Sequence, residues 1–158
     1  MKLELDVQKA TDQVVRGLLP NDAEIEHWVC MALQKKYNSA QLTVRIVGYE
    51  ESRQLNEKFR HRSGPTNVLS FPFERPDMVQ PPLLGDIVIC GPLVVKEAAD
   101  QNKEVKAHWA HIVIHGVLHL LGYDHEDADE ANIMESLEKK IMTELNYPDP
   151  YALSHDQL

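Results

Sequence analysis

The stretch that most constrains this chain runs from His115 to His125, with histidines at positions 115, 119 and 125. On a helix, side chains four residues apart lie on the same face, with Cβ atoms about 6 Å apart. Two imidazoles at this spacing can therefore converge on one small cation. Gly122 is the residue best suited to end such a helix in a left-handed cap and turn the chain back. His125 follows this turn and completes a set of three nitrogen ligands.

Three neutral imidazoles with an open fourth position are typical of a catalytic zinc rather than a structural one. We therefore predict one Zn²⁺ per chain, bound by His115, His119 and His125. A zinc ion with this ligand set keeps a labile water and lowers its pKa toward about 7. Hydrolysis is the chemistry that we expect from this site.

The spacing H-x-x-x-H-x-x-G-x-x-H is also that of the metzincin proteases, in which a glutamate after the first histidine is the general base. In this chain that position is Gly116. The missing carboxylate argues against hydrolysis by that route, and a zinc hydrolase of peptide or amide bonds remains the alternative enzyme.

Two neighbouring residues are candidates for supporting the metal ligands. His111 lies one helical turn before His115, so we expect it either to contact the site from outside the ligand set or to pack in the core. Asp124 stands beside the third histidine. It could orient a ligand or act as a base, but we favour a role in capping the turn.

Hydrophobic periodicity predicts an α+β fold in a single domain spanning residues 1–158. Four strands are expected, at residues 2–7, 42–47, 67–73 and 84–90. Five helices are expected, at residues 20–37, 50–60, 92–101, 105–121 and from the acidic run 126–130 onward. Residues 84–90 are nearly all apolar, which favours a central strand. Pro72 should end the third strand or place it at an edge.

Some finer features also follow from the pattern. We expect Phe59 and Ile133 to point inward from their helices, because each stands at helical spacing from other apolar residues. The acidic run 126–130 matches the positive end of a helix dipole. The tail after about residue 147 is expected to fray.

The net charge of −9 argues against a protein that coats nucleic acid by bulk electrostatics. Any contact with nucleic acid then needs a local basic patch. The densest positive stretch holds Lys58, Arg60, His61 and Arg62. Arginine offers a planar fork that suits phosphate. A helix C-terminus with cations placed against its dipole is the alternative explanation.

Cys30 and Cys90 fit no zinc-binding or redox motif. We expect both to be free thiols in a reducing cytoplasm. The first residues alternate charged and apolar side chains, unlike a signal peptide. The longest apolar runs fall short of a membrane span. The sequence therefore predicts a cytoplasmic protein with no membrane partner.

Three motifs together resemble the YbeY family of bacterial endoribonucleases. They are the histidine motif 115–125, the segment from Pro65 to Phe73 (PTNVLSFPF) and the segment from Leu84 to Ile87 (LGDI). They occur in the family's order and at family-like distances, so the resemblance covers nearly the whole chain.

The resemblance implies a small mixed sheet and a zinc held by the three histidines. It also implies single-strand-specific RNA cleavage, maturation of 16S ribosomal RNA 3′ ends, ribosome quality control and association with the small ribosomal subunit. DNA is not expected as a partner. The family's functionally important arginine matches Arg60, so we expect a metal-activated water to attack the phosphodiester while Arg60 stabilises charge. Lys58 and Arg62 are candidates for binding substrate. Ser63 stands where many members carry an aspartate, so that residue's role is not carried over.

A third class of function is a ribosome-assembly factor that binds RNA or protein and uses its zinc structurally. A structural zinc usually has four protein ligands. The sequence offers no clear fourth ligand near the motif, which favours the endoribonuclease.

Overall fold

The computed structural model describes residues 1–15 and 17–152. Within these residues it has four strands, five α-helices and one short 3₁₀ helix. In chain order the elements are β1 (Lys2–Ala10), α1 (Asp22–Leu33), β2 (Ser39–Val47), α2 (Tyr49–Arg60), β3 (Val68–Pro72), η1 (Pro76–Met78), β4 (Leu83–Cys90), α3 (Gly91–Asp100), α4 (Val105–Leu120) and α5 (Ala128–Glu144).

The four strands form one mixed sheet in the order β1-β2-β4-β3. β1, β2 and β4 run parallel, and β3 pairs antiparallel with β4. The predicted α+β fold is confirmed, and the apolar strand β4 is internal as expected. β3 lies at an edge and ends at Pro72, where the missing N–H group costs the ladder little.

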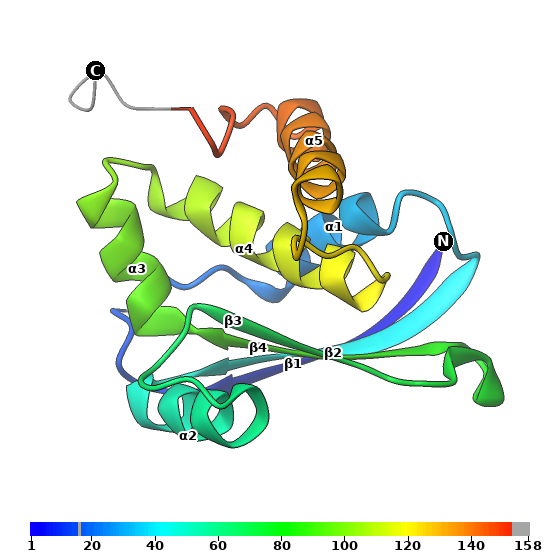
Figure 1. Ribbon diagram of the computed structural model, residues 1–158, viewed down its shortest axis with the longest axis horizontal. Coiled ribbons are helices and arrows are strands. Elements are labelled where there is room, and N and C mark those ends of the chain that lie inside the picture. Colours follow the sequence, from blue (N-terminus) through cyan, green and yellow to red (C-terminus); the bar gives the residue numbers. More distant parts are fainter. Residues whose placement is uncertain (16, 153–158) are drawn as a thin grey trace.

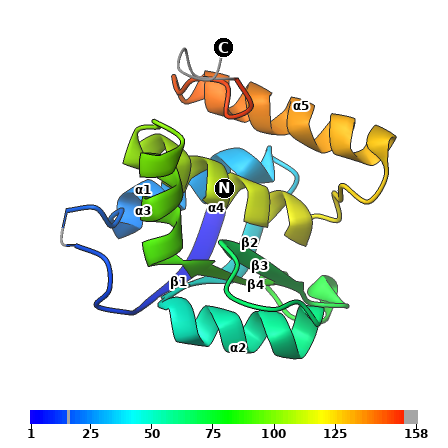
Figure 2. The same ribbon diagram turned by 60° about the vertical axis from the view of Figure 1, so that its left-hand side comes forward.

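The helices are unevenly distributed over the two faces of the sheet. Figures 1 and 2 show α2 alone on one face, with α1, α3 and α4 on the other. α5 lies across the outer side of α4, so α4 is enclosed between the sheet and α5. The helix that carries the histidine motif is therefore the centre of the larger layer.

The sequence of α4 explains its central place. It is apolar on nearly every side, and twelve of its sixteen residues are buried. A helix that is hydrophobic all round is stable only when neighbours cover it on all sides. Trp109, which is 1% exposed, also places its indole N–H 2.9 Å from the carbonyl oxygen of Leu18. This bond satisfies the one polar group of a large core side chain.

Two side chains that were predicted to point into the core are exposed, so these two predictions were wrong. Phe59 is 46% exposed and stands edge-on to Phe71, because α2 turns the polar residues Ser52 and Asn56 inward instead. These two side chains hydrogen-bond the carbonyl oxygens of Thr66 and Gly64, at 2.8 Å in each case, and so hold the loop before β3.

Ile133 is 55% exposed, because α5 directs Met134, Glu138 and Ile141 toward the core. α1 also ends earlier than predicted, at Leu33, and is closed by a left-handed Gln34.

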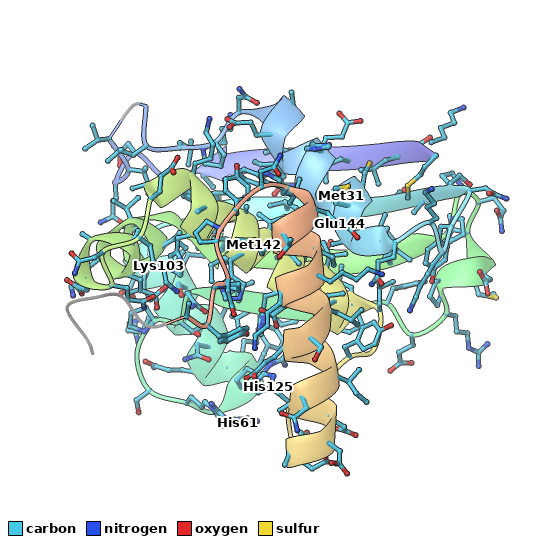
Figure 3. All side chains as sticks on the ribbon, turned by 90° about the horizontal axis from the view of Figure 1, so that it is seen from above. Met31, His61, Lys103, His125, Met142 and Glu144 are labelled. Atoms are coloured by element: carbon cyan, nitrogen blue, oxygen red, sulfur yellow. The ribbon has the colours of Figure 1, made fainter. Side chains whose placement is uncertain are left out.

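The tail after about residue 147, where fraying is expected, is described as far as residue 152. Pro150 is buried, and the Lys103 ammonium donates a 2.8 Å hydrogen bond to its carbonyl oxygen. Figure 3 shows the segment returning from the end of α5 toward Lys103. Residues 153–158 lie outside the described part. No helix among the described residues has the length and apolar character needed to cross a membrane.

Gly85 lies where two neighbours approach β4 most closely. Its φ is +140°, in a region that L residues rarely adopt. A Cβ atom there would lie 2.2 Å from the Phe71 carbonyl oxygen and 3.0 Å from a methyl carbon of Leu120. Gly85 therefore allows both β3 and the last turn of α4 to pack tightly against β4.

We expect Gly85→Ala to lower the free energy of unfolding by about 2–4 kcal/mol, because backbone strain and a steric clash add. The matched control is Gly17→Ala, since Gly17 also has a positive φ of +99° but no atom within 4 Å of the added Cβ. The control should lose only about 1 kcal/mol. Urea denaturation measures both, and equal losses in the two variants would contradict the packing argument.

Candidate metal centre

The chain reverses direction at the end of α4 in the way that the glycine predicts. Gly122 has a φ of +98°. Its N–H bonds the carbonyl oxygen of His119 at 3.0 Å, and the N–H of Tyr123 bonds that of Leu118 at 3.1 Å. This pair of bonds is a Schellman motif, which satisfies the last carbonyls of a helix. The turn brings His125 back toward the helix end.

The three predicted ligands converge. Ring nitrogens of His115, His119 and His125 all lie within 4.8 Å of one another. The Nε2 atoms of His115 and His119 are 3.2 Å apart. Two nitrogens bound at about 2.0–2.1 Å to a tetrahedral zinc are about 3.3 Å apart, so the observed separation fits a shared metal. Among the described residues, no fourth metal-ligating side chain joins this group.

The site is open on one side and enclosed on the other. The side chain of His125 is 57% exposed, whereas that of His115 is 22% exposed. Seen from above, His125 lies beside the first half of α5 (Figure 3). Burial, together with the nearby His115 and His125, lowers the pKa of His119 to about 4. The neutral imidazole, which is the metal-binding form, is therefore favoured at neutral pH.

A buried carboxylate supports the ligands from the enclosed side. Glu138 on α5 is fully buried. One oxygen lies 3.1 Å from Nδ1 of His115, and the other contacts Nε2 of His111 and accepts a 2.7 Å hydrogen bond from the hydroxyl of Tyr151. Burial alone would raise the pKa of Glu138, but the hydrogen bonds from His111 and His115 lower it to about 2. The group is therefore a carboxylate and acts only as an acceptor.

Sequence reasoning missed Glu138 and Tyr151. One signal for Glu138 was present, since it lies four residues after Met134 and three before Ile141, on the inward stripe of its helix. A charged residue on such a stripe needs a buried partner. Its partner lies 23 residues away in sequence, and no short motif links the two. His111 is buried and contacts Glu138.

The other candidates near the motif have simpler roles. The Asp124 carboxylate accepts a 2.7 Å bond from the backbone N–H of His125, but it lies 4.0 Å from Nδ1 of that histidine. The hydrogen bond of Asp124 is thus to the backbone of the turn and not to the imidazole of His125. The acidic run begins α5 as expected, with Asp127 accepting from the backbone N–H of Glu130. His108 is a core residue and hydrogen-bonds Glu97 at 3.0 Å.

Arg60 is linked through β3 to α4, the helix that carries His115 and His119. Its guanidinium donates a 2.7 Å hydrogen bond to the carbonyl oxygen of Ser70. The hydroxyl of Ser70 in turn donates a 2.9 Å bond to the carbonyl oxygen of Gly116, the residue next to His115. The guanidinium also lies 5.1 Å from the ring centre of Phe71. The edge strand thus connects the exposed arginine to the helix that bears the histidines.

Lys58 and Arg62, the two candidates for binding substrate, are both exposed at the end of α2. The ammonium of Lys58 lies 5.1 Å from the ring centre of Phe59. The basic stretch therefore remains accessible at the surface.

Gly116 faces the sheet. A Cβ atom added there would lie 2.9 Å from a methyl carbon of Ile87 and 3.3 Å from one of Val68. The position that holds the general base in metzincins is therefore packed against β3 and β4. This packing explains why the small residue is required and argues further against the peptidase alternative.

The low pKa of His119 makes the stability of the metal-free protein depend on pH. The folded value of about 4 lies below the ordinary 6.5, so between these values the unfolded chain binds a proton that the folded chain does not. The contribution of His119 to stability is therefore complete above pH 6.5 and is lost as the pH falls toward 4. Urea denaturation across this range should show a steeper fall in the wild type than in His119→Gln. Parallel curves would contradict the assignment.

Comparisons with known proteins identify the family of the chain. The chain matches the family described as Endoribonuclease YbeY over residues 8–146. An endoribonuclease YbeY of Pseudomonas putida is 52% identical over 151 residues, covering 95% of this chain and 94% of the relative. One of Pseudomonas fluorescens is 52% identical over 151 residues, covering 95% and 97%. The solution structure of TM1509 from Thermotoga maritima shares the fold, with a TM-score of 0.57 and 24% identity over 94% of this chain and 99% of that one. The chain belongs to the endoribonuclease YbeY family.

Proposed function

We propose that this protein is a zinc-dependent endoribonuclease that cuts single-stranded RNA and matures the 3′ end of 16S ribosomal RNA during ribosome quality control. The family match supports an endoribonuclease. The observation that carries the metal dependence is the convergence of His115, His119 and His125 at the open end of α4. Three histidines and a free position are the ligand set of a catalytic zinc.

We assign the metal to these three histidines. When bound there, zinc supplies an activated water and a positive charge beside the phosphodiester. The chain's own contribution is to hold the three rings in place. α4 fixes His115 and His119 one turn apart, and the Gly122 turn fixes His125. The half-buried His115 and His119 close the inner side of the site. We therefore propose that substrate approaches from the side of the exposed His125.

Arg60 is the proposed catalytic residue outside the metal ligands. The guanidinium has five N–H donors and uses one on Ser70 and another, at 3.3 Å, on the carbonyl oxygen of Phe59. The remaining donors have no hydrogen-bond partner within residues 1–15 and 17–152, and we propose that they bind phosphate oxygens and stabilise the charge that develops during phosphoryl transfer. Lys58 and Arg62 flank it and are proposed to contact neighbouring phosphates.

The charge of the chain shapes how RNA binds. A net charge of −9 opposes tight binding of free RNA. The basic stretch at the end of α2 provides local attraction, so binding should be weak and sensitive to salt. We propose that the small ribosomal subunit presents the RNA and raises its local concentration.

The cytoplasm is the proposed location, since Cys30 and Cys90 are free thiols that suit a reducing compartment.

The binding-factor alternative requires a structural zinc with four protein ligands. The group of three histidines gains no fourth ligand from the described residues, and the side chain of His125 is largely exposed. Both features favour a site that leaves a position for water or substrate.

RNA cleavage by the zinc-loaded wild type and Arg60→Glu tests the proposal. The wild type should cut a single-stranded oligoribonucleotide and spare the same sequence in a duplex. Arg60→Glu should retain its zinc but lose about 100-fold or more in rate, because a charge-stabilising donor is replaced by a repelling one. Lys140→Glu, an exposed charge reversal on α5, is the matched control and should cleave normally.

Two outcomes would contradict the proposal in different ways. A wild type that holds zinc but cuts no RNA would favour the binding factor. An Arg60→Glu variant that keeps both zinc and full cleavage would remove the arginine from the mechanism and leave the metal site untouched.

A further inference from the structure

We propose that Glu138 is the positioning residue of the metal centre. We also propose that the C-terminal segment, the described residues 145–152 after α5, holds Glu138 in place through Tyr151. This inference rests on the proposed binding of metal by His115, His119 and His125. In this inference, the carboxylate of Glu138, supported by His111 and Tyr151, orients the ligand His115.

The two ring nitrogens of His115 face different partners. Nε2 lies 3.2 Å from Nε2 of His119, on the side where the three ligands converge. Nδ1 lies 3.1 Å from a carboxylate oxygen of Glu138. Since an ionised carboxylate only accepts, Nδ1 must carry the proton, and Nε2 keeps its lone pair for the metal. Glu138 therefore selects the tautomer and fixes the ring orientation of His115.

Glu138 is placed to orient a ligand rather than to be one. It lies on the Nδ1 side of His115, opposite the convergence point. Its oxygens are occupied by His115, His111 and Tyr151, and the residue is fully buried. Three donors satisfy a charge that would be very costly to bury alone.

His111 contributes as a neutral donor. Burial lowers its pKa, although Glu138 opposes this effect. The Nε2–H of the neutral ring donates a hydrogen bond to Glu138, and Nδ1 has no hydrogen-bond partner among the described residues. In this tautomer the buried Nδ1 is an acceptor that no hydrogen bond satisfies, which is a cost that accompanies the bond from His111 to Glu138.

The C-terminal segment completes the support. Tyr151 donates its hydroxyl to Glu138 at 2.7 Å, and its ring stands edge-on to His111. Burial and the neighbouring carboxylate raise the pKa of Tyr151, so the hydroxyl keeps its proton. Pro150 is buried and bound by Lys103, which anchors the segment one residue away. Tyr151 is thus connected to His115 by two hydrogen bonds, one from Tyr151 to Glu138 and one between Glu138 and His115.

Zinc affinity, measured by competition with a chromophoric chelator, tests this inference without any RNA. Glu138→Gln should fold and bind zinc about 10–100-fold more weakly, as expected when an outer partner of a metal ligand is altered. Tyr151→Phe should lose about twofold to tenfold, the worth of one ordinary hydrogen bond. The matched controls are Glu144→Gln, exposed on the same helix, and Tyr49→Phe, and both should bind zinc as the wild type does.

A nuclear magnetic resonance measurement separates positioning from a general loss of structure. In the zinc-loaded wild type, the Nδ1 proton of His115 should appear as a downfield resonance that exchanges slowly with solvent. In Glu138→Gln it should shift upfield and exchange faster, while the core resonances are unchanged.

Unchanged zinc affinity and an unchanged His115 resonance in both variants would overturn the inference. If Glu138→Gln fails to fold, Tyr151→Phe alone decides, and wild-type affinity there removes the C-terminal segment from the site. A wild type that binds no zinc would instead contradict the proposed function, so the two failures are distinguishable.

Discussion

The whole structure depends on burying α4 on almost every side while leaving its His115 and His119 side chains only half-buried. The sheet lies under this helix, α1 and α3 flank it, and α5 crosses above it (Figure 1). An apolar helix of this kind gains free energy in proportion to the surface that its neighbours cover. Because the covering is nearly complete, the position of the last turn is fixed to the same precision as the core. The positions of His115 and His119 on this helix are therefore fixed as well as those of the core residues.

The burial of α4 also affects the ionisable side chains on and beside this helix. A helix buried this deeply brings histidines into a region of low dielectric, where neutral forms are favoured. For His119 the lowered pKa favours this neutral form, which is the form that binds a metal. The carboxylate of Glu138 is then tolerated because three donors surround it. Burial that would be costly for one charged group becomes the means of orienting a ligand.

Much of the fold and the metal centre could be predicted because the signals are local. The spacing of His115 and His119, the Gly122 turn and the apolar strand β4 each follow from a few adjacent residues. The family resemblance added Arg60, whose link to α4 runs through Ser70 and Gly116. No local pattern shows that connection.

The two side chains wrongly predicted to point inward share one physical cause. Phe59 and Ile133 were expected inside because helical spacing gives a stripe but not the rotation of a helix against its neighbours. In α2 that rotation is decided by Ser52 and Asn56, which bind a loop. In α5 it is decided by the pairing of Glu138 with residues of α4. Tertiary polar contacts overrode hydrophobic periodicity in both helices.

The central claim is that three histidines bind one metal and leave a position open. An X-ray absorption spectrum of the zinc-loaded protein at neutral pH tests it most directly. The account predicts three imidazole nitrogens and one further light atom at about 2.0–2.1 Å. A sulfur shell at about 2.3 Å, or a spectrum with fewer than three imidazoles, would contradict it.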